Sequence, residues 1–110
     1  MVTLLVPWLK AFLVTQLFEL PVYWFATRSL RIGFLASAMT HPIVWFVFPL
    51  LPTPYWVMIA LAETFAVIAE AAWLHFNGLP RTRAFLWSLL ANATSVAFGL
   101  TIRWATDGWV

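Results

Sequence analysis

The residues of this chain that could do chemistry lie inside its apolar stretches. They are three carboxylic acids, one imidazole and one carboxamide: Glu19, His41, Glu63, Glu70 and Asn92. Carboxylates and imidazole bind cations, exchange protons and act as acids and bases. A charged side chain at the centre of a bilayer costs about 2.5–3.5 kcal/mol on insertion scales, and such side chains usually face one another and mark a functional site. The sequence therefore predicts a buried substrate- or ion-binding site built from these five residues.

The composition determines what kind of element carries them. Hydrophobic residues make up 64% of the chain and charged residues 9%, whereas a soluble domain carries about 25% charged residues. At about 20 residues per crossing, the chain predicts four membrane spans, at about 4–25, 32–51, 55–76 and 84–102. We expect residues 1–110 to form one all-α transmembrane domain, an integral membrane four-helix bundle of two tandem helical hairpins.

The arginines of the connectors predict the topology. Two connectors carry them, Arg28 and Arg31 in one and Arg81 and Arg83 in the other, while the connector at 52–54 has no charge. Because basic loops stay in the cytoplasm, we expect a multi-pass protein of the inner (cell) membrane with both termini extracytoplasmic. Tyr23 is expected in the aromatic belt at the cytoplasmic interface.

Helical spacing places a polar seam on each predicted span. The seams combine the five residues above with supporting polar side chains, namely Gln16, Ser37, Thr40, Ser88 and Ser95. Polar and small residues let membrane helices approach and bond, so we expect the seams to meet at the bundle centre. At 1.5 Å per residue, Glu19 and Glu70 lie about 10 Å inside the cytoplasmic boundary, with Asn92 and His41 at similar depth and Glu63 about 20 Å inside.

The two predicted hairpins align with each other at an offset of 51 residues. This offset superimposes Glu19 on Glu70, Ser37 on Ser88 and His41 on Asn92. Both copies would run in the same direction, so a duplication would give a parallel internal repeat related by an axis along the membrane normal. The alternative is that any two hydrophobic hairpins align.

Each polar residue also has a purely structural interpretation. A protonated Glu19 or Glu70 could join two helices through a hydrogen bond, His41 could be satisfied at a bend caused by Pro42, and Asn92 could form an interhelical bond. A metal site from Glu19, His41 and Glu70 is a minor hypothesis, because no metal-ligand spacing is present. Cysteine is absent, and no cofactor is expected.

Three classes of function remain open from the sequence. The favoured one is ion- or proton-coupled translocation of a small solute by an oligomer, since titrating carboxylates and a histidine can carry protons through a bundle. The second is a non-catalytic accessory subunit of a larger membrane complex. The third is an intramembrane enzyme that uses glutamate and histidine on a lipid or peptide, but no catalytic motif is recognised, so we assign no catalytic residue. The expected partners are the lipid bilayer and either further copies or other membrane subunits; nucleic acid is not expected.

Overall fold

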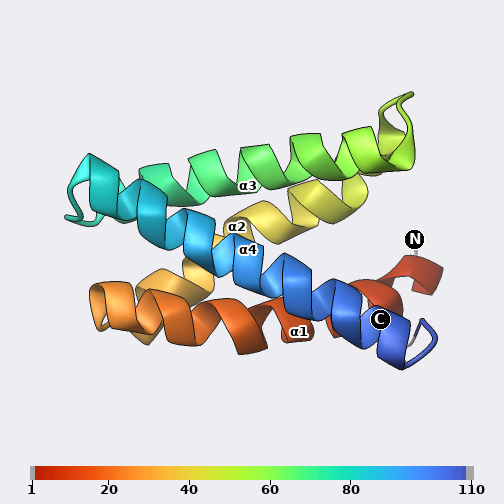
Figure 1. Cartoon of the computed structure of the whole chain (residues 1–110), viewed down its shortest axis with the longest axis horizontal. Helices are drawn as coiled ribbons and strands as arrows, with labels where there is room; N and C mark the ends of the chain where they lie inside the picture. The colour runs from red at the N-terminus through yellow and green to blue at the C-terminus, as the bar shows by residue number, and fades with distance from the viewer. Residues whose placement is uncertain (1, 109–110) are drawn as a thin grey trace.

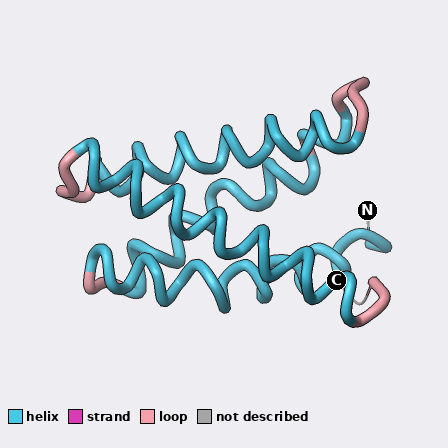
Figure 2. Tube along the Cα trace, viewed as in Figure 1, coloured by secondary structure: helices cyan, strands magenta, loops and turns pink. Residues whose placement is uncertain are grey.

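The computed structural model describes residues 2–108 and consists almost entirely of helices (Figure 1, Figure 2). The elements are α1 (Val2–Thr27), α2 (Leu30–Phe46), the short 3-10 helix η1 (Phe48–Leu50), α3 (Tyr55–Phe76) and α4 (Arg81–Ala105). Each of the four α-helices, the second taken together with η1, is long and apolar enough to cross a membrane. The predicted all-α four-span membrane fold is confirmed.

The helix bounds differ from the predicted spans at several ends. The third span matches, whereas α1 and α4 extend beyond their predicted spans at both ends, so that Arg81 and Arg83 lie in the first turn of α4 instead of in a loop. The second helix starts earlier than predicted and ends at Phe46, where η1 takes over. Proline disfavours α-helical backbone in the residue before it, and Pro49 follows Phe48 directly. Both helices continue through their internal prolines, which are Pro7 and Pro21 in α1 and Pro42 in α2.

The four α-helices form a closed ring of neighbours. α1 packs on α2, α2 on α3, α3 on α4, and α4 returns to α1. In Figure 1 the α1–α2 and α3–α4 connectors lie together at the left, and the start of α1, the end of α4 and the α2–α3 connector lie at the right. We call these the arginine end, after Arg28, Arg31, Arg81 and Arg83, and the terminal end.

The outer surface of the bundle is apolar, as a lipid environment requires. Large side chains such as Leu13, Leu17 and Ile68 are at least 60% exposed, and they sit in the middle of their helices. The core is made of small and polar residues instead, which allows the helices to approach closely. Burial is thus inverted relative to a soluble bundle, in agreement with a multi-pass membrane protein.

The buried positions of the two hairpins correspond, with a change of register between the first and second helices. Ala11 and Glu19 of α1 match Ala62 and Glu70 of α3 at an offset of 51. In the second helices the buried set Gly33, Ala36, Ser37 and Thr40 matches Ser88, Ala91, Asn92 and Ser95 at an offset of 55. Four residues are one helical turn. The expected pairing of His41 with Asn92 therefore does not occur; Ser37 occupies the position that corresponds to Asn92.

Candidate functional site

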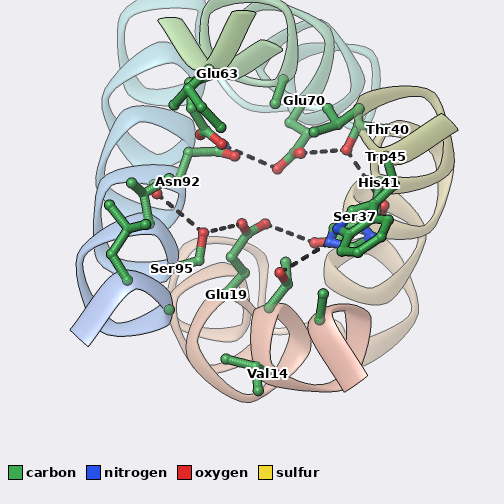
Figure 3. A pocket seen from close by; sticks show the side chains of 18 of the residues that line it. Val14, Glu19, Ser37, Thr40, His41, Trp45, Glu63, Glu70, Asn92 and Ser95 are labelled. Carbon is green, nitrogen blue, oxygen red and sulfur yellow. Dashed lines mark hydrogen bonds between the residues drawn. The ribbon is translucent and has the colours of Figure 1, made fainter. Parts of the chain in front are cut away.

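Two buried carboxyl groups, from Glu19 of α1 and Glu70 of α3, face one another at the bundle centre (Figure 3). Each is bound by side chains of both α2 and α4. Glu19 accepts hydrogen bonds from Ser37 Oγ of α2 at 2.8 Å and from Ser95 Oγ of α4 at 2.5 Å. Glu70 accepts from Thr40 Oγ1 of α2 at 2.6 Å and from Asn92 Nδ2 of α4 at 3.1 Å. The two carboxyl groups and these four side chains make a ring that joins all four helices, which we call the carboxyl ring.

A fifth hydrogen-bond donor reaches the carboxyl ring from the side of the arginine end. The hydroxyl of Tyr23, on α1, donates to Glu70 Oε1, the same oxygen that accepts from Asn92. The second amide hydrogen of Asn92 is directed to the carbonyl of Ser88, at 2.9 Å. All five hydrogen bonds to the two carboxyl groups come from neutral side chains. The charge on these groups is therefore set by protons or by a bound cation, and not by a fixed arginine or lysine of the ring.

The two oxygens of each carboxyl group have different surroundings. Oε2 of Glu70 faces the Thr40 hydroxyl, which also lies 3.2 Å from the Ala36 carbonyl. Oε2 of Glu19 faces the Ser95 hydroxyl, which also lies 3.1 Å from the Asn92 carbonyl. A hydroxyl has one proton to donate and lone pairs to accept. Each hydroxyl can donate to an ionised carboxylate, or turn to the carbonyl and accept from a protonated one.

The carboxyl ring therefore accepts a proton on either Oε2 without moving any heavy atom. Oε1 of each glutamate keeps its donors, Ser37 for Glu19 and both Tyr23 and Asn92 for Glu70. Buried polar groups that remain satisfied in both protonation states avoid the penalty of about 1–3 kcal/mol for a lost partner.

A cavity of about 190 Å³ begins at the carboxyl ring. Its lining runs from Glu19 back to Ala11 on α1 and from Asn92 on to Arg103 on α4, and both directions lead to the terminal end. Arg103 is exposed, so the cavity reaches the surface there. Over 11 residues of α4 the cavity has a depth of about 16 Å. Trp45 and Ile59 line the part of the cavity nearer the terminal end, and polar side chains of the carboxyl ring line its blind end.

The opposite end of the bundle is closed. A hydrophobic cluster of Tyr23, Ala36, Leu74, Ala84 and Ala91 fills the space between the carboxyl ring and the arginine end, and each of its members is at most 1% exposed. Trp73 and Trp87 pack around it. The cavity is thus one-sided: it opens at the terminal end and ends blind on Glu19 and Glu70.

His41 lines the cavity but does not join the carboxyl ring. Its Nε2 lies 3.3 Å from Thr15 Oγ1, and its ring packs against those of Trp8 and Phe12 at centroid distances of 6.3 and 5.4 Å. Its buried Nδ1 has no hydrogen-bond partner among the described residues. Depth alone suggested a contact between His41 and the glutamates. No hydrogen bond of the described residues joins them.

The minor metal hypothesis from Glu19, His41 and Glu70 is not supported. Within residues 2–108, no group of three or more histidine, aspartate or glutamate side chains is placed to share a metal ion. Glu63, half-buried on α3, lines the cavity two turns above Glu70 toward the terminal end. It lies where its depth in the sequence predicts, between the carboxyl ring and the mouth.

The supporting polar residues divide into two groups. Ser37, Thr40 and Ser95 bind the carboxyl groups directly. Gln16 and Ser88 are buried but do not line the cavity: Gln16 Nε2 donates to the Phe34 carbonyl at 3.4 Å, and Ser88 Oγ donates to the Val67 carbonyl at 2.7 Å. These two residues join neighbouring helices instead of forming the site.

Tyr23 and Thr15 belong to the site although neither was among the predicted site residues. Tyr23, expected in an interfacial belt, has no exposed surface and bonds Glu70. Its spacing of four residues from Glu19 places both on the polar seam of the first span, and the burial of Tyr23 agrees with that seam and not with the interfacial belt. Thr15 also lies four residues from Glu19 and contacts His41 inside the cavity.

Comparisons with known proteins give no family for this arrangement: no protein-family model, no curated protein and no solved structure matches the chain. Function has to be argued from the site itself.

Proposed function

We propose that this protein translocates a small cation across the membrane in exchange for protons, with Glu19 and Glu70 as the groups that bind both. The observation that carries the proposal is the one-sided cavity that ends on two carboxyl groups, each with an oxygen that accepts a proton without rearrangement. A cavity open to one face and closed to the other is what an alternating-access carrier presents in one of its states.

The charge of the cavity supports a cationic cargo. Three carboxylic acids line it, Glu19, Glu63 and Glu70, against one cationic side chain, Arg103 at the mouth. Low dielectric surroundings strengthen the attraction between a desolvated cation and carboxylates. Proton and cation would compete for the same carboxyl oxygens, so binding of one releases the other.

The positions of the arginines support an orientation for the carrier. With Arg28, Arg31, Arg81 and Arg83 gathered at one end, the positive-inside rule places that end in the cytoplasm. The cavity of the present state would then open to the outside. Because the cavity lies within one chain, the pathway we propose needs no second copy; assembly into an oligomer or with other membrane subunits stays a separate prediction.

The test is proton flux in vesicles that contain the purified protein. A pH-sensitive dye inside the vesicles reports protons that move when a gradient of sodium, ammonium or tetramethylammonium is imposed. We expect cation-dependent proton flux above that of empty vesicles, reduced at least tenfold in Glu70→Gln and in Glu19→Gln. Asp107→Asn is the matched control, because Asp107 is the one acid outside the cavity and is exposed. Equal flux in all four proteins, or none above empty vesicles, would contradict the proposal.

A further inference from the structure

The side chain of Tyr23 connects the carboxyl ring to the closed end of the bundle. It lies one helical turn from Glu19 toward the arginine end, with no exposed surface. Its hydroxyl donates to Glu70 Oε1, and Asn92 Nδ2 lies 3.4 Å from the same hydroxyl. One side chain of α1 is thereby bound to α3 and to α4. Rotation of the Tyr23 side chain about its Cα–Cβ bond would carry the hydroxyl away from Glu70 and break this bond.

Tyr23 and Leu74 supply the bulk that closes the cavity. The other members of the hydrophobic cluster beneath the carboxyl ring are alanines, Ala36, Ala84 and Ala91. Tyr23 and Leu74 are also the largest of the fully buried side chains, and they occupy corresponding positions, 51 residues apart. Without the Tyr23 ring, the buried cluster would retain Leu74 and three alanines, with partly buried side chains such as Trp73 and Trp87 around it.

The backbone of α1 at Tyr23 lies close against α2, which leaves side-chain rotation as the local change that needs no separation of these two helices. An added Cβ at Gly33 of α2 would lie 2.9 Å from Tyr23 Cβ, which shows how closely α1 and α2 approach at this level. At its other end the Tyr23 side chain is held by packing in the hydrophobic cluster and by the hydrogen bonds of its hydroxyl with Glu70 and Asn92. Rotation of the ring about its first side-chain bonds is therefore the smallest change that opens this end.

On the basis of the proposed function, we propose that Tyr23 is the gate at the arginine end and that its hydroxyl senses whether Glu70 is ionised. A hydrogen bond to an ionised carboxylate is roughly twice as strong as one to a neutral group. An ionised Glu70 holds Tyr23 across the pathway. A proton or a cation arriving from the cavity neutralises Glu70, weakens the bond and releases the gate.

The groups that face Glu70 are consistent with this coupling. The titratable neighbours are Glu19 and Tyr23 of α1, His41 of α2 and Glu63 of α3, while α4 contributes the neutral Asn92 at the ring and Arg103 at the mouth. His41 is bonded to Thr15 and not to either carboxyl group of the ring. Glu70 is the one acid that Tyr23 binds directly.

The absence of cysteine from the sequence makes the gate directly measurable. A cysteine at Ala66, a buried residue of the cavity wall, is labelled in vesicles by a charged, membrane-impermeant thiol reagent added to one face at a time. Cysteines at the exposed Thr53 and Thr82 identify the terminal face and the arginine face in separate samples. Each labelling rate is measured with Glu70 intact and with Glu70→Gln, which is permanently neutral.

We expect Ala66→Cys to react from the terminal face in every background. From the arginine face it should react at least tenfold faster in Glu70→Gln than with Glu70 intact. Tyr23→Phe keeps the ring and loses the hydroxyl, so it should give the same acceleration by itself, with no further gain when Glu70→Gln is added. Tyr55→Phe is the matched control, since the chain has two tyrosines and Tyr55 is exposed at the other end of the bundle; it should leave all rates unchanged.

Two results would overturn the gate. One is that Tyr23→Phe labels from the arginine face at the parent rate; the other is that the accelerations from Tyr23→Phe and Glu70→Gln multiply, as for independent sites. Labelling from the terminal face reports that each variant is folded. Because labelling needs no cargo or gradient, a gate that responds to Glu70 in a protein without cation-driven flux would refute the proposed function and leave the gate intact.

Discussion

The two oxygens of each buried carboxyl group have different hydrogen-bond partners and therefore different roles. Oε1 of Glu70 is fixed by donors, Tyr23 and Asn92, whereas Oε2 faces the Thr40 hydroxyl, which has a backbone carbonyl as its alternative acceptor. Glu19 shows the same division, with Ser95 in the adaptable position. Position is held by one oxygen and protonation is accommodated at the other, so that Oε2 can take up a proton while the donors to Oε1 still have their acceptor.

This division predicts the effect of removing one hydroxyl. Thr40→Val keeps the side-chain shape and leaves Glu70 Oε2 without its partner, so we expect a loss of stability of about 1–3 kcal/mol and a severalfold or larger decrease in proton flux. Thr40→Ser retains the hydroxyl and should retain the flux. Thr64→Val is the control, because Thr64 is exposed and its hydroxyl donates to the Ala60 carbonyl of its own helix. A Thr40→Val protein with parental flux would show that the hydroxyl takes no part.

The sequence predicted the depth of the site residues but not which of two adjacent residues points into the site. Depth and helical seams correctly brought Glu19, Glu70 and Asn92 to one level. Depth could not separate Thr40 from His41, since adjacent helical residues share a depth but point about 100° apart, and the structure turns Thr40 to Glu70 and His41 to Thr15. Tyr23 was misplaced because a tyrosine near the end of a span satisfies its hydroxyl equally well at the lipid interface or inside the bundle.

At the scale of elements, the two hairpins are alike in composition but not in register. α1 and α3 correspond at an offset of 51, while the second helices correspond at 55 both in their buried positions and along the cavity, where Trp45 corresponds to Leu100. Such a shift by one helical turn preserves which face of a helix is buried. A single sequence offset therefore could not reveal it. The internal repeat stays a prediction, and the register shift changes which residues would be equivalent in it.

The helices approach more closely at Gly33 of α2 than at Gly99 of α4, and this difference predicts the effects of two substitutions. Gly33→Ala would place Cβ 2.9 Å from Tyr23 Cβ and 3.1 Å from Leu20 Cδ1. Because Tyr23 Cβ is fixed to the backbone, the helices must separate, and we expect a loss of about 1–3 kcal/mol, measured by thermal unfolding in detergent. Gly99→Ala meets nothing within 4 Å and should be neutral or stabilising by about 0.5–1 kcal/mol. An equal effect of both substitutions would contradict the tight contact at Gly33.

For the molecule as a whole, the decisive property is that one chain contains the entire cavity. The ring of contacts from α1 to α4 is closed within the chain, and all four α-helices contribute side chains to the cavity lining. The exterior consists of large apolar side chains suited to lipid or to other membrane helices. Among the described residues, the five hydrogen bonds to Glu19 and Glu70 all come from side chains of the same chain; a pathway that needs no second copy is part of the proposed function.

A mixing experiment tests this self-sufficiency. Vesicles are prepared from wild-type and Glu70→Gln protein that have been co-expressed, so that any oligomers contain both. If each chain carries its own pathway, flux should fall in direct proportion to the wild-type fraction, because an inactive neighbour leaves the intact cavity unchanged. A pathway shared by two copies would lose flux with the square of that fraction, leaving about one quarter at an equal mixture. A measured value near one half in the equal mixture therefore assigns the pathway to the single four-helix bundle, whatever oligomer the protein forms.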